Sequence, residues 1–292
     1  MSIYLKFISG AFQPRSLFIP MASIILGTGL SALQWPVDGS LFASCIVLVI
    51  IAQTALNLAG NYQAAYVNHA NATQQQGDRV ALLRLSYAMA MLFAIGFILL
   101  LSVSVGFAMP SILLSLSLLI PFAITVRMKT LFSKAQLYQY KKVHMSFWAL
   151  ANGFLPCVIA FYLHTAHISD YSVAAGACAA LLALLISLSK QALFIIEQHQ
   201  LIDAEQLPQS LATNLKWQKL VVITTSLATA ATIYWLNIPY LAGICILALP
   251  SIVATIATVE HLPEADIASA QTTKVQIAYF AYWVLFIVGV ML

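Results

Sequence analysis

Long apolar segments recur along the whole chain, and they restrict its fold more than any other feature. A helix that crosses a hydrocarbon core of about 30 Å needs about 20 apolar residues. We predict nine such helices, near residues 16–34, 41–67, 80–107, 110–126, 146–163, 172–196, 218–236, 240–260 and 274–292. Lipid offers no partner to backbone groups, and the segments are too long for barrel strands. The sequence therefore predicts an all-α, multi-pass membrane protein with one domain over residues 1–292.

The charged residues support this interpretation. Only 8% of the residues are charged, against about 25% in soluble domains. With nine crossings, all 13 Lys and Arg residues fall on the same side of the membrane. The positive-inside rule then predicts a cytoplasmic N-terminus and an external C-terminus, in an inner (cytoplasmic) membrane. No basic cluster is interleaved with exposed aromatic residues, so we expect a lipid bilayer and no nucleic acid as partner.

A polar stripe interrupts the second apolar segment. Gln53, Asn57 and Asn61 follow one another at intervals of four residues, so on a helix they share one face. Their amide groups both donate and accept hydrogen bonds, and such groups are costly in hydrocarbon unless they meet partners or a wet cavity. The stripe leads into residues 68–79, which we expect to form a polar loop. We predict that the stripe lines a cavity open to the cytoplasmic side.

A second polar segment follows the sixth apolar segment and carries carboxylates. Glu197, Asp203 and Glu205, together with His199, are candidate ligands of a divalent cation such as Mg²⁺. The alternative is a solvated helix end without a metal. Lys190 lies seven residues before Glu197, hence on the same helical face, and the two could pair with each other. The second and sixth helices thus end in comparable polar segments, which suggests two halves that flank a common cavity.

Several short motifs resemble the UbiA superfamily of intramembrane prenyltransferases, and most closely its 1,4-dihydroxy-2-naphthoate polyprenyltransferases. The motifs are Phe12-Gln13-Pro14-Arg15-Ser16-Leu17, Leu26-Gly27-Thr28-Gly29-Leu30, Asn57-Leu58-Ala59-Gly60-Asn61-Tyr62, Asn152-Gly153-Phe154-Leu155 and Gln209-Ser210-Leu211-Ala212. The resemblance spans most of the chain. It implies a UbiA-like bundle of nine helices with a central cavity open to the cytoplasm.

The resemblance also implies a reaction. Family members ionise a polyprenyl diphosphate, whose prenyl cation is captured by an electron-rich aromatic acceptor, and Mg²⁺ is held on the diphosphate by two aspartate-rich motifs. Here both motifs are degenerate: Asn61 and Ala64 stand where the first has aspartates, and His199 stands where the second begins. The candidates for binding the substrate or its diphosphate are Gln53, Asn57, Asn61, Arg79, Arg127, Lys129 and Lys190. The candidates for the metal are Glu197, His199 and Asp203. No catalytic residue is assigned.

Two functions from different classes remain open at this level. One is an enzyme that transfers a prenyl group to a naphthoate-like acceptor in quinone (menaquinone) biosynthesis. The alternative is a non-catalytic relative that has lost the metal-binding aspartates and binds an isoprenoid or quinone, or docks to a synthase partner. A homo-oligomer is also conceivable. A transporter ranks last, because no charge lies deep in any predicted helix to form an ion path.

Overall fold

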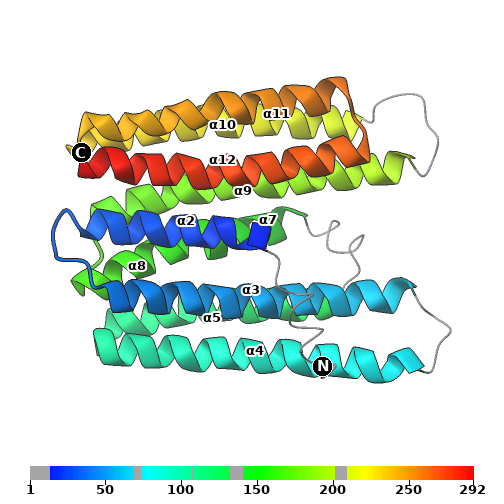
Figure 1. The fold of residues 1–292 in the computed structure, drawn as a ribbon, viewed down its shortest axis with the longest axis horizontal. Coiled ribbons are helices and arrows are strands. Elements are labelled where there is room, and N and C mark those ends of the chain that lie inside the picture. The colour runs from blue at the N-terminus through cyan, green and yellow to red at the C-terminus, as the bar shows by residue number, and fades with distance from the viewer. Residues whose placement is uncertain (1–13, 69–73, 107, 132–140, 201–208) are drawn as a thin grey trace. The chain divides into compact units, whose positions relative to one another are not determined.

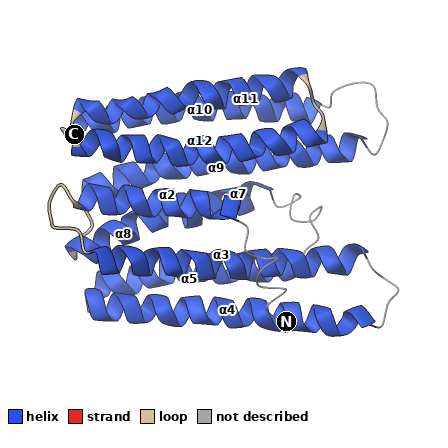
Figure 2. Cartoon of the chain, in the orientation of Figure 1, coloured by secondary structure: helices blue, strands red, loops and turns tan. Residues whose placement is uncertain are grey.

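All regular structure in the described part of the chain is helical. The computed structural model describes residues 14–68, 74–106, 108–131, 141–200 and 209–292 (Figures 1 and 2). Its elements are α2 (Pro14–Ser31), α3 (Gly39–Asn68), α4 (Gln74–Ser104), α5 (Met109–Leu131), α7 (Lys141–Ala149), the π-helical turn η1 (Leu150–Phe154), α8 (Leu155–Thr165), α9 (Asp170–Gln200), α10 (Gln209–Trp235), the 3₁₀ segment η2 (Tyr240–Ala248), α11 (Leu249–His261) and α12 (Ala265–Met291).

The predicted fold class is confirmed. α7, η1 and α8 follow one another without a break, as do η2 and α11, so the described ranges contain nine helical segments. Seven of them are long and apolar enough to cross a membrane, and Leu17–Ser31 forms a shorter apolar helix. α10 is long enough, with 27 residues, but its many threonines lower its hydropathy. The chain is a multi-pass membrane protein.

Several helices begin earlier than the apolar pattern predicts. α4 begins at Gln74 rather than near residue 80, α10 at Gln209 rather than near 218, and α12 at Ala265 rather than near 274. Residues 74–79, predicted as part of a loop, are therefore helical. Adding a residue to an existing helix costs little compared with nucleating one, so a membrane helix continues beyond the lipid into a polar segment. Hydropathy detects only the part inside the lipid.

The chain divides into two compact units, and the first is built around α3. This unit 1 comprises Met1–Leu17 and Asp38–Phe147. Within it α3 packs against both α4 and α5. Leu58 of α3 and Leu82 of α4 form a small buried core with Tyr62, Leu85 and Met89 around it. The Ser86 hydroxyl donates a hydrogen bond of 3.0 Å to the Ala55 carbonyl, which links α4 to α3.

The second unit is built around α9 and α12. This unit 2 comprises Phe18–Val37 and Trp148–Leu292. α9 packs against η1, α8, α10 and α12, and α12 also packs against η2 and α11. The core of the unit is aromatic: Trp283, Tyr279, Tyr282 and Phe286 of α12 are at most 1% exposed. Close approach of backbones depends on glycine, because a Cβ on Gly289 would collide with the Leu241 carbonyl of η2.

Candidate functional site

The polar stripe predicted from the sequence lies in α3 of unit 1. Gln53, Asn57 and Asn61 are all inside this helix at intervals of four residues, so they lie along one face. Their exposure changes along the stripe: Gln53 is 9% exposed, whereas Asn57 and Asn61 are half-buried. The stripe therefore runs from the packed interior of unit 1 towards the polar end of α3, where a charged ligand is solvated more easily.

The structure brings one candidate cation to this stripe. The ammonium of Lys129, in the last turn of α5, donates a hydrogen bond of 3.4 Å to the carbonyl of Leu56, the residue before Asn57. Lys129 is half-buried. A half-buried ammonium interacts more strongly with an anion than one in bulk water, because less solvent screens it. The hydrogen bond therefore brings the Lys129 ammonium to the backbone of α3, one residue before Asn57.

The second cation of α5 is held in place by a tyrosine. The Arg127 guanidinium donates a 3.0 Å hydrogen bond to the hydroxyl of Tyr87 in α4, and this hydroxyl lies 3.4 Å from Oγ1 of Thr130. Arg127 itself is exposed, so its planar group can reach a phosphate, which it suits by geometry. Sequence reasoning missed Tyr87 and Thr130. Tyr87 lies in an apolar stretch, and only the packing of α4 against α5 reveals its partner.

Lys190, the candidate cation of unit 2, lies against an aromatic ring. Its ammonium is 5.1 Å from the ring centroid of Trp148, a cation–π contact between α9 and α7. Lys190 does not pair with Glu197, as the spacing had suggested it could; Glu197 is exposed and makes no ion pair among the described residues. The ring face balances part of the charge of Lys190 without neutralising it.

The motif Asn152-Gly153-Phe154 forms the π-helical turn η1, a feature that the sequence did not predict. π turns are rare and are frequent at functional sites. The Asn152 amide donates 2.9 Å to the carbonyl of Trp148, the residue under Lys190. The Ser23 hydroxyl donates 3.0 Å to the Asn152 carbonyl and lies 2.8 Å from the hydroxyl of Tyr279. We call Ser23, Trp148, Asn152, Lys190 and Tyr279 the π-turn cluster.

The π-turn cluster joins residues of unit 2 from five elements. Ser23 comes from α2, Trp148 from α7, Asn152 from η1, Lys190 from α9 and Tyr279 from α12. Ser23, Asn152 and Tyr279 are at most 5% exposed. Buried polar groups that are satisfied in this way fix one arrangement of the helices around them. The cluster therefore holds Trp148, and with it Lys190, in a defined position at the start of the η1 turn.

The metal candidates are only partly described. Glu197 is exposed, near the end of α9. Asp203 lies outside the described residues, as do the side chains of His199 and Arg79. Among the residues that the structure does describe, no group of three His, Cys, Asp or Glu side chains could hold a metal ion. A single carboxylate is too few ligands for a metal site formed by protein alone, although Mg²⁺ is commonly bound by one or two carboxylates together with substrate phosphates.

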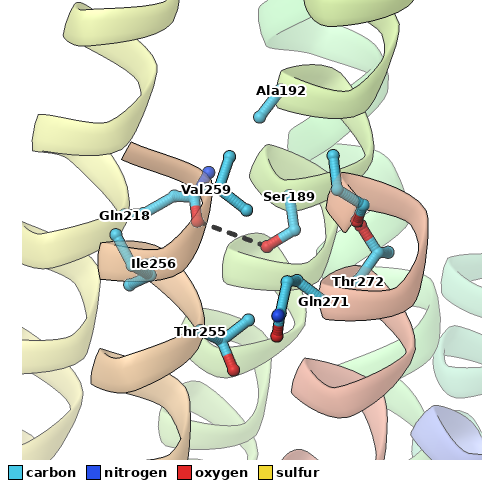
Figure 3. A pocket seen from close by; sticks show the side chains of 9 residues that line it. Ser189, Ala192, Gln218, Thr255, Ile256, Val259, Gln271 and Thr272 are labelled. Atoms are coloured by element: carbon cyan, nitrogen blue, oxygen red, sulfur yellow. Dashed lines mark hydrogen bonds between the residues drawn. The ribbon is translucent and has the colours of Figure 1, made fainter. Parts of the chain in front are cut away.

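Unit 2 also encloses a small cavity with uncharged polar walls. Side chains of α9, α10, α11 and α12 line it, among them Ser189, Gln218, Thr255 and Gln271 (Figure 3). The Ser189 hydroxyl donates 3.3 Å to the Gln218 carbonyl oxygen, and the Gln218 amide donates 2.7 Å to Asn214. The cavity measures about 10 Å³, which is close to the room that one water needs. It is far too small for a prenyl chain or an aromatic acceptor.

Comparison with known proteins supports the fold and leaves the family open. No protein-family model and no curated protein matches this chain. A solved chain from a study of the biosynthesis of digeranylgeranylglyceryl phosphate synthase in membranes is similar, with a TM-score of 0.60. The alignment covers 99% of this chain and 98% of that chain at 12% sequence identity. At this identity the likeness is one of fold alone, and the alignment covers nearly the full length of both chains.

Proposed function

We propose that this protein is an intramembrane prenyltransferase of the UbiA type. The observation that carries the proposal is the hydrogen bond of Lys129 to the Leu56 carbonyl, which brings the ammonium of α5 to the part of α3 that carries Asn57. Arg127 of the same helix end would supply a second cation for a diphosphate. The fold likeness gives independent support. The name of the similar protein denotes a product with geranylgeranyl chains, which are isoprenoids. Fold alone does not imply function, so the proposal depends on these side chains.

The chemistry proposed for unit 1 is the stabilisation of a leaving group. When the bond between the allylic carbon and the diphosphate oxygen breaks, negative charge develops on the diphosphate. Preorganised cations and amide donors at that position lower the barrier, because they are oriented before the reaction begins. Lys129 and Arg127 would take the charge, and Asn57 and Asn61 would orient the phosphate oxygens. The ring of the acceptor would then form the new carbon–carbon bond to the prenyl cation. The substituted ring carbon would lose its proton, to the released diphosphate or to water, or its carboxyl group as carbon dioxide, and the ring would regain its aromaticity.

We extend the proposal to the acceptor and the setting of the reaction. The motif resemblance favours an aromatic acceptor similar to 1,4-dihydroxy-2-naphthoate, and hence a step of quinone biosynthesis. The reaction would occur at the cytoplasmic face of the inner membrane, with the N-terminus inside and the C-terminus outside, as the thirteen basic residues indicate. Gln53 and Lys190 remain candidates for substrate contacts, and the chain would act as one domain over its whole length, alone or as an oligomer.

Mg²⁺ is the cofactor that the resemblance implies, and the described residues fit it poorly. Glu197 is the one candidate carboxylate among them whose side chain is described, and the α3 stripe carries amides where an acidic motif would carry carboxylates. The proposed chemistry therefore contains no step at the ion. If Mg²⁺ takes part, it would reach the protein mainly on the diphosphate itself, with Glu197, His199 and Asp203 as candidate ligands.

The absence of aspartates at the positions of Asn61 and Ala64 favours a second candidate function. This function is that of a non-catalytic protein that binds an isoprenoid or a quinone. Asn61 keeps the polarity of the stripe but brings no charge to a metal, and Ala64 brings no ligand at all. A protein of this kind would retain the binding surface of Lys129 and Arg127 without turnover. It would also be free to dock to a catalytically active synthase.

One assay separates the two functions. The purified protein in lipid nanodiscs is incubated with a radiolabelled polyprenyl diphosphate, Mg²⁺ and either 1,4-dihydroxy-2-naphthoate or 4-hydroxybenzoate. For an enzyme we expect prenylated acceptor and free diphosphate, and the double variant Lys129→Gln, Arg127→Gln should lose at least tenfold in rate. Lys216→Gln is the matched control, because it removes an exposed lysine of α10 in the other unit. Saturable binding without release of diphosphate would reject the enzyme and support the binding protein.

A further inference from the structure

A groove between α11 and α12 has one polar end and one apolar end. It is lined by Ala248 and Ser251 of η2 and α11 and by Lys274, Ile277, Ala278 and Ala281 of α12, and its volume is about 220 Å³. Lys274, Ile277, Ala278 and Ala281 follow each other at three- and four-residue intervals, so they share one face of α12. The groove contains none of the residues proposed above for the diphosphate.

The two helices align the polar residues with each other. α11 ends at His261 and α12 begins at Ala265, and this short connection makes the helices antiparallel neighbours. Ser251 precedes the end of α11 by about as many residues as Lys274 follows the start of α12. Ser251 and Lys274 therefore lie at one level of the groove, and Ala248, Ala278 and Ala281 lie further from the connection. Small alanine side chains leave the room that makes the apolar part of the groove.

The length of the apolar part of α12 indicates a depth for Lys274 near the membrane boundary. At 1.5 Å per residue, the part of α12 from Val275 to Met291 is about 25 Å long, close to the thickness of the hydrocarbon core. Lys274 then lies at the boundary with the lipid headgroups, where a lysine can extend its ammonium into the headgroup layer. The apolar part of the groove lies within the acyl chains.

The charge of Lys274 is not balanced by any carboxylate in the described part of the chain. Lys274 is exposed and makes no ion pair among the residues whose placement is described, whereas Lys219 pairs with Glu260 at 2.7 Å. The neighbouring Ser251 is exposed as well and offers a hydroxyl. The polar end of the groove thus offers a cation and a hydroxyl to an anionic headgroup, and the apolar end offers a surface to the attached acyl chains.

We propose that this groove binds an anionic phospholipid of the surrounding membrane. The phosphate of the lipid would meet Lys274 and Ser251, and one acyl chain would lie along Ala278 and Ala281. Basic pockets between membrane helices on the cytoplasmic side bind lipid headgroups in this manner. A groove of about 220 Å³ holds the headgroup and only the first part of one acyl chain, so exchange with the bulk membrane should be fast. This site is independent of the function proposed for unit 1.

Native mass spectrometry of the intact protein tests this proposal. The protein is titrated with phosphatidylglycerol or with phosphatidylcholine of the same acyl chains. We expect phosphatidylglycerol to bind more tightly, and Lys274→Gln to weaken it about fivefold, the factor expected for one basic side chain at an anionic surface. Lys274→Arg should keep the preference. Ala281→Leu should weaken both lipids alike, because it fills the apolar part of the groove without changing the charge.

The controls distinguish a built site from general attraction. Lys216→Gln removes the same charge from an exposed position on α10 that does not line the groove. Equal losses for Lys216→Gln and Lys274→Gln would overturn the proposal, since they would show a diffuse effect of net charge. Farnesyl diphosphate is added as competitor. If it displaces phosphatidylglycerol at equal concentration in a manner that depends on Lys274, the occupant is an isoprenoid diphosphate and the phospholipid assignment is wrong.

Discussion

Replacing Gly153 by alanine should destabilise the π-helical turn η1, on which the π-turn cluster depends. A Cβ at this position would lie 2.6 Å from Cα of Ala180 and 2.7 Å from the carbonyl carbon and oxygen of Ala179. Ordinary contact begins near 3.4 Å, so η1 and α9 would have to separate by about 0.8 Å. The colliding atoms belong to backbone and cannot rotate away.

The expected loss in the free energy of unfolding is the difference between two opposing contributions. Inserting one carbon into a packed interior costs about 1–3 kcal/mol, and a collision with backbone belongs at the upper end. Alanine recovers about 0.5–1 kcal/mol, because glycine loses more conformational freedom on folding. The net destabilisation is about 2 kcal/mol. With a shift of about 2–4 °C per kcal/mol in chains of this size, the midpoint of thermal unfolding should fall by about 4–8 °C.

Thermal unfolding of the purified protein in one detergent measures this difference. The buried cysteines Cys157 and Cys178 become reactive on unfolding, so a thiol-reactive fluorophore reports the transition. Gly60→Ala is the matched control, since a Cβ on Gly60 of α3 would meet nothing within 4 Å. That variant should be neutral or stabilised by up to about 1 kcal/mol. A Gly153→Ala protein as stable as wild type would refute the packing argument, because it would mean that η1 and α9 are not in close contact.

Three further predictions concern side chains whose contacts are described. Ser23→Ala removes the hydroxyl between Asn152 and Tyr279 and should cost about 1–3 kcal/mol in the same unfolding assay. The exposed Thr224→Ala of α10 should cost less than about 0.5 kcal/mol. Lys219→Gln breaks the exposed ion pair with Glu260 and should cost less than about 1 kcal/mol, a loss that disappears in high salt. Asn61→Asp restores a carboxylate to the α3 stripe and should lower the Mg²⁺ concentration for half-maximal prenyl transfer about tenfold; an unchanged Mg²⁺ requirement would argue against a metal at this position.

The sequence predicted the helices well because the lipid imposes a single rule on them. Each crossing must be helical and apolar over about 30 Å, so the nine segments and their order can be recognised without tertiary information. Their ends could not be found as well. Gln74, Gln209 and Ala265 begin helices outside the apolar segments, where neither hydropathy nor charge distinguishes helix from loop.

The candidate site was predicted residue by residue, but its contacts were not. The four-residue spacing of Gln53, Asn57 and Asn61 is a property of a single helix and can be read directly. The contact of Lys129 with Leu56 is different, since it joins residues 73 positions apart and requires α5 to pack beside α3. The hydrogen bond of Arg127 to Tyr87 depends in the same way on α4 and α5. Neither pair can be predicted from the spacing of these residues in the sequence.

The π turn shows why local patterns were insufficient. A π turn inserts one residue into a helix and rotates everything beyond it, so a motif judged by regular helical spacing is assigned to the wrong face. Asn152 and Gly153 were noted only as part of a family-like motif. Their packing explains that motif physically: Gly153 allows the close approach to α9, and Asn152 bonds the carbonyl of Trp148, over whose ring Lys190 lies. The motif therefore positions Lys190, a cation of α9, although Asn152 and Gly153 are themselves uncharged.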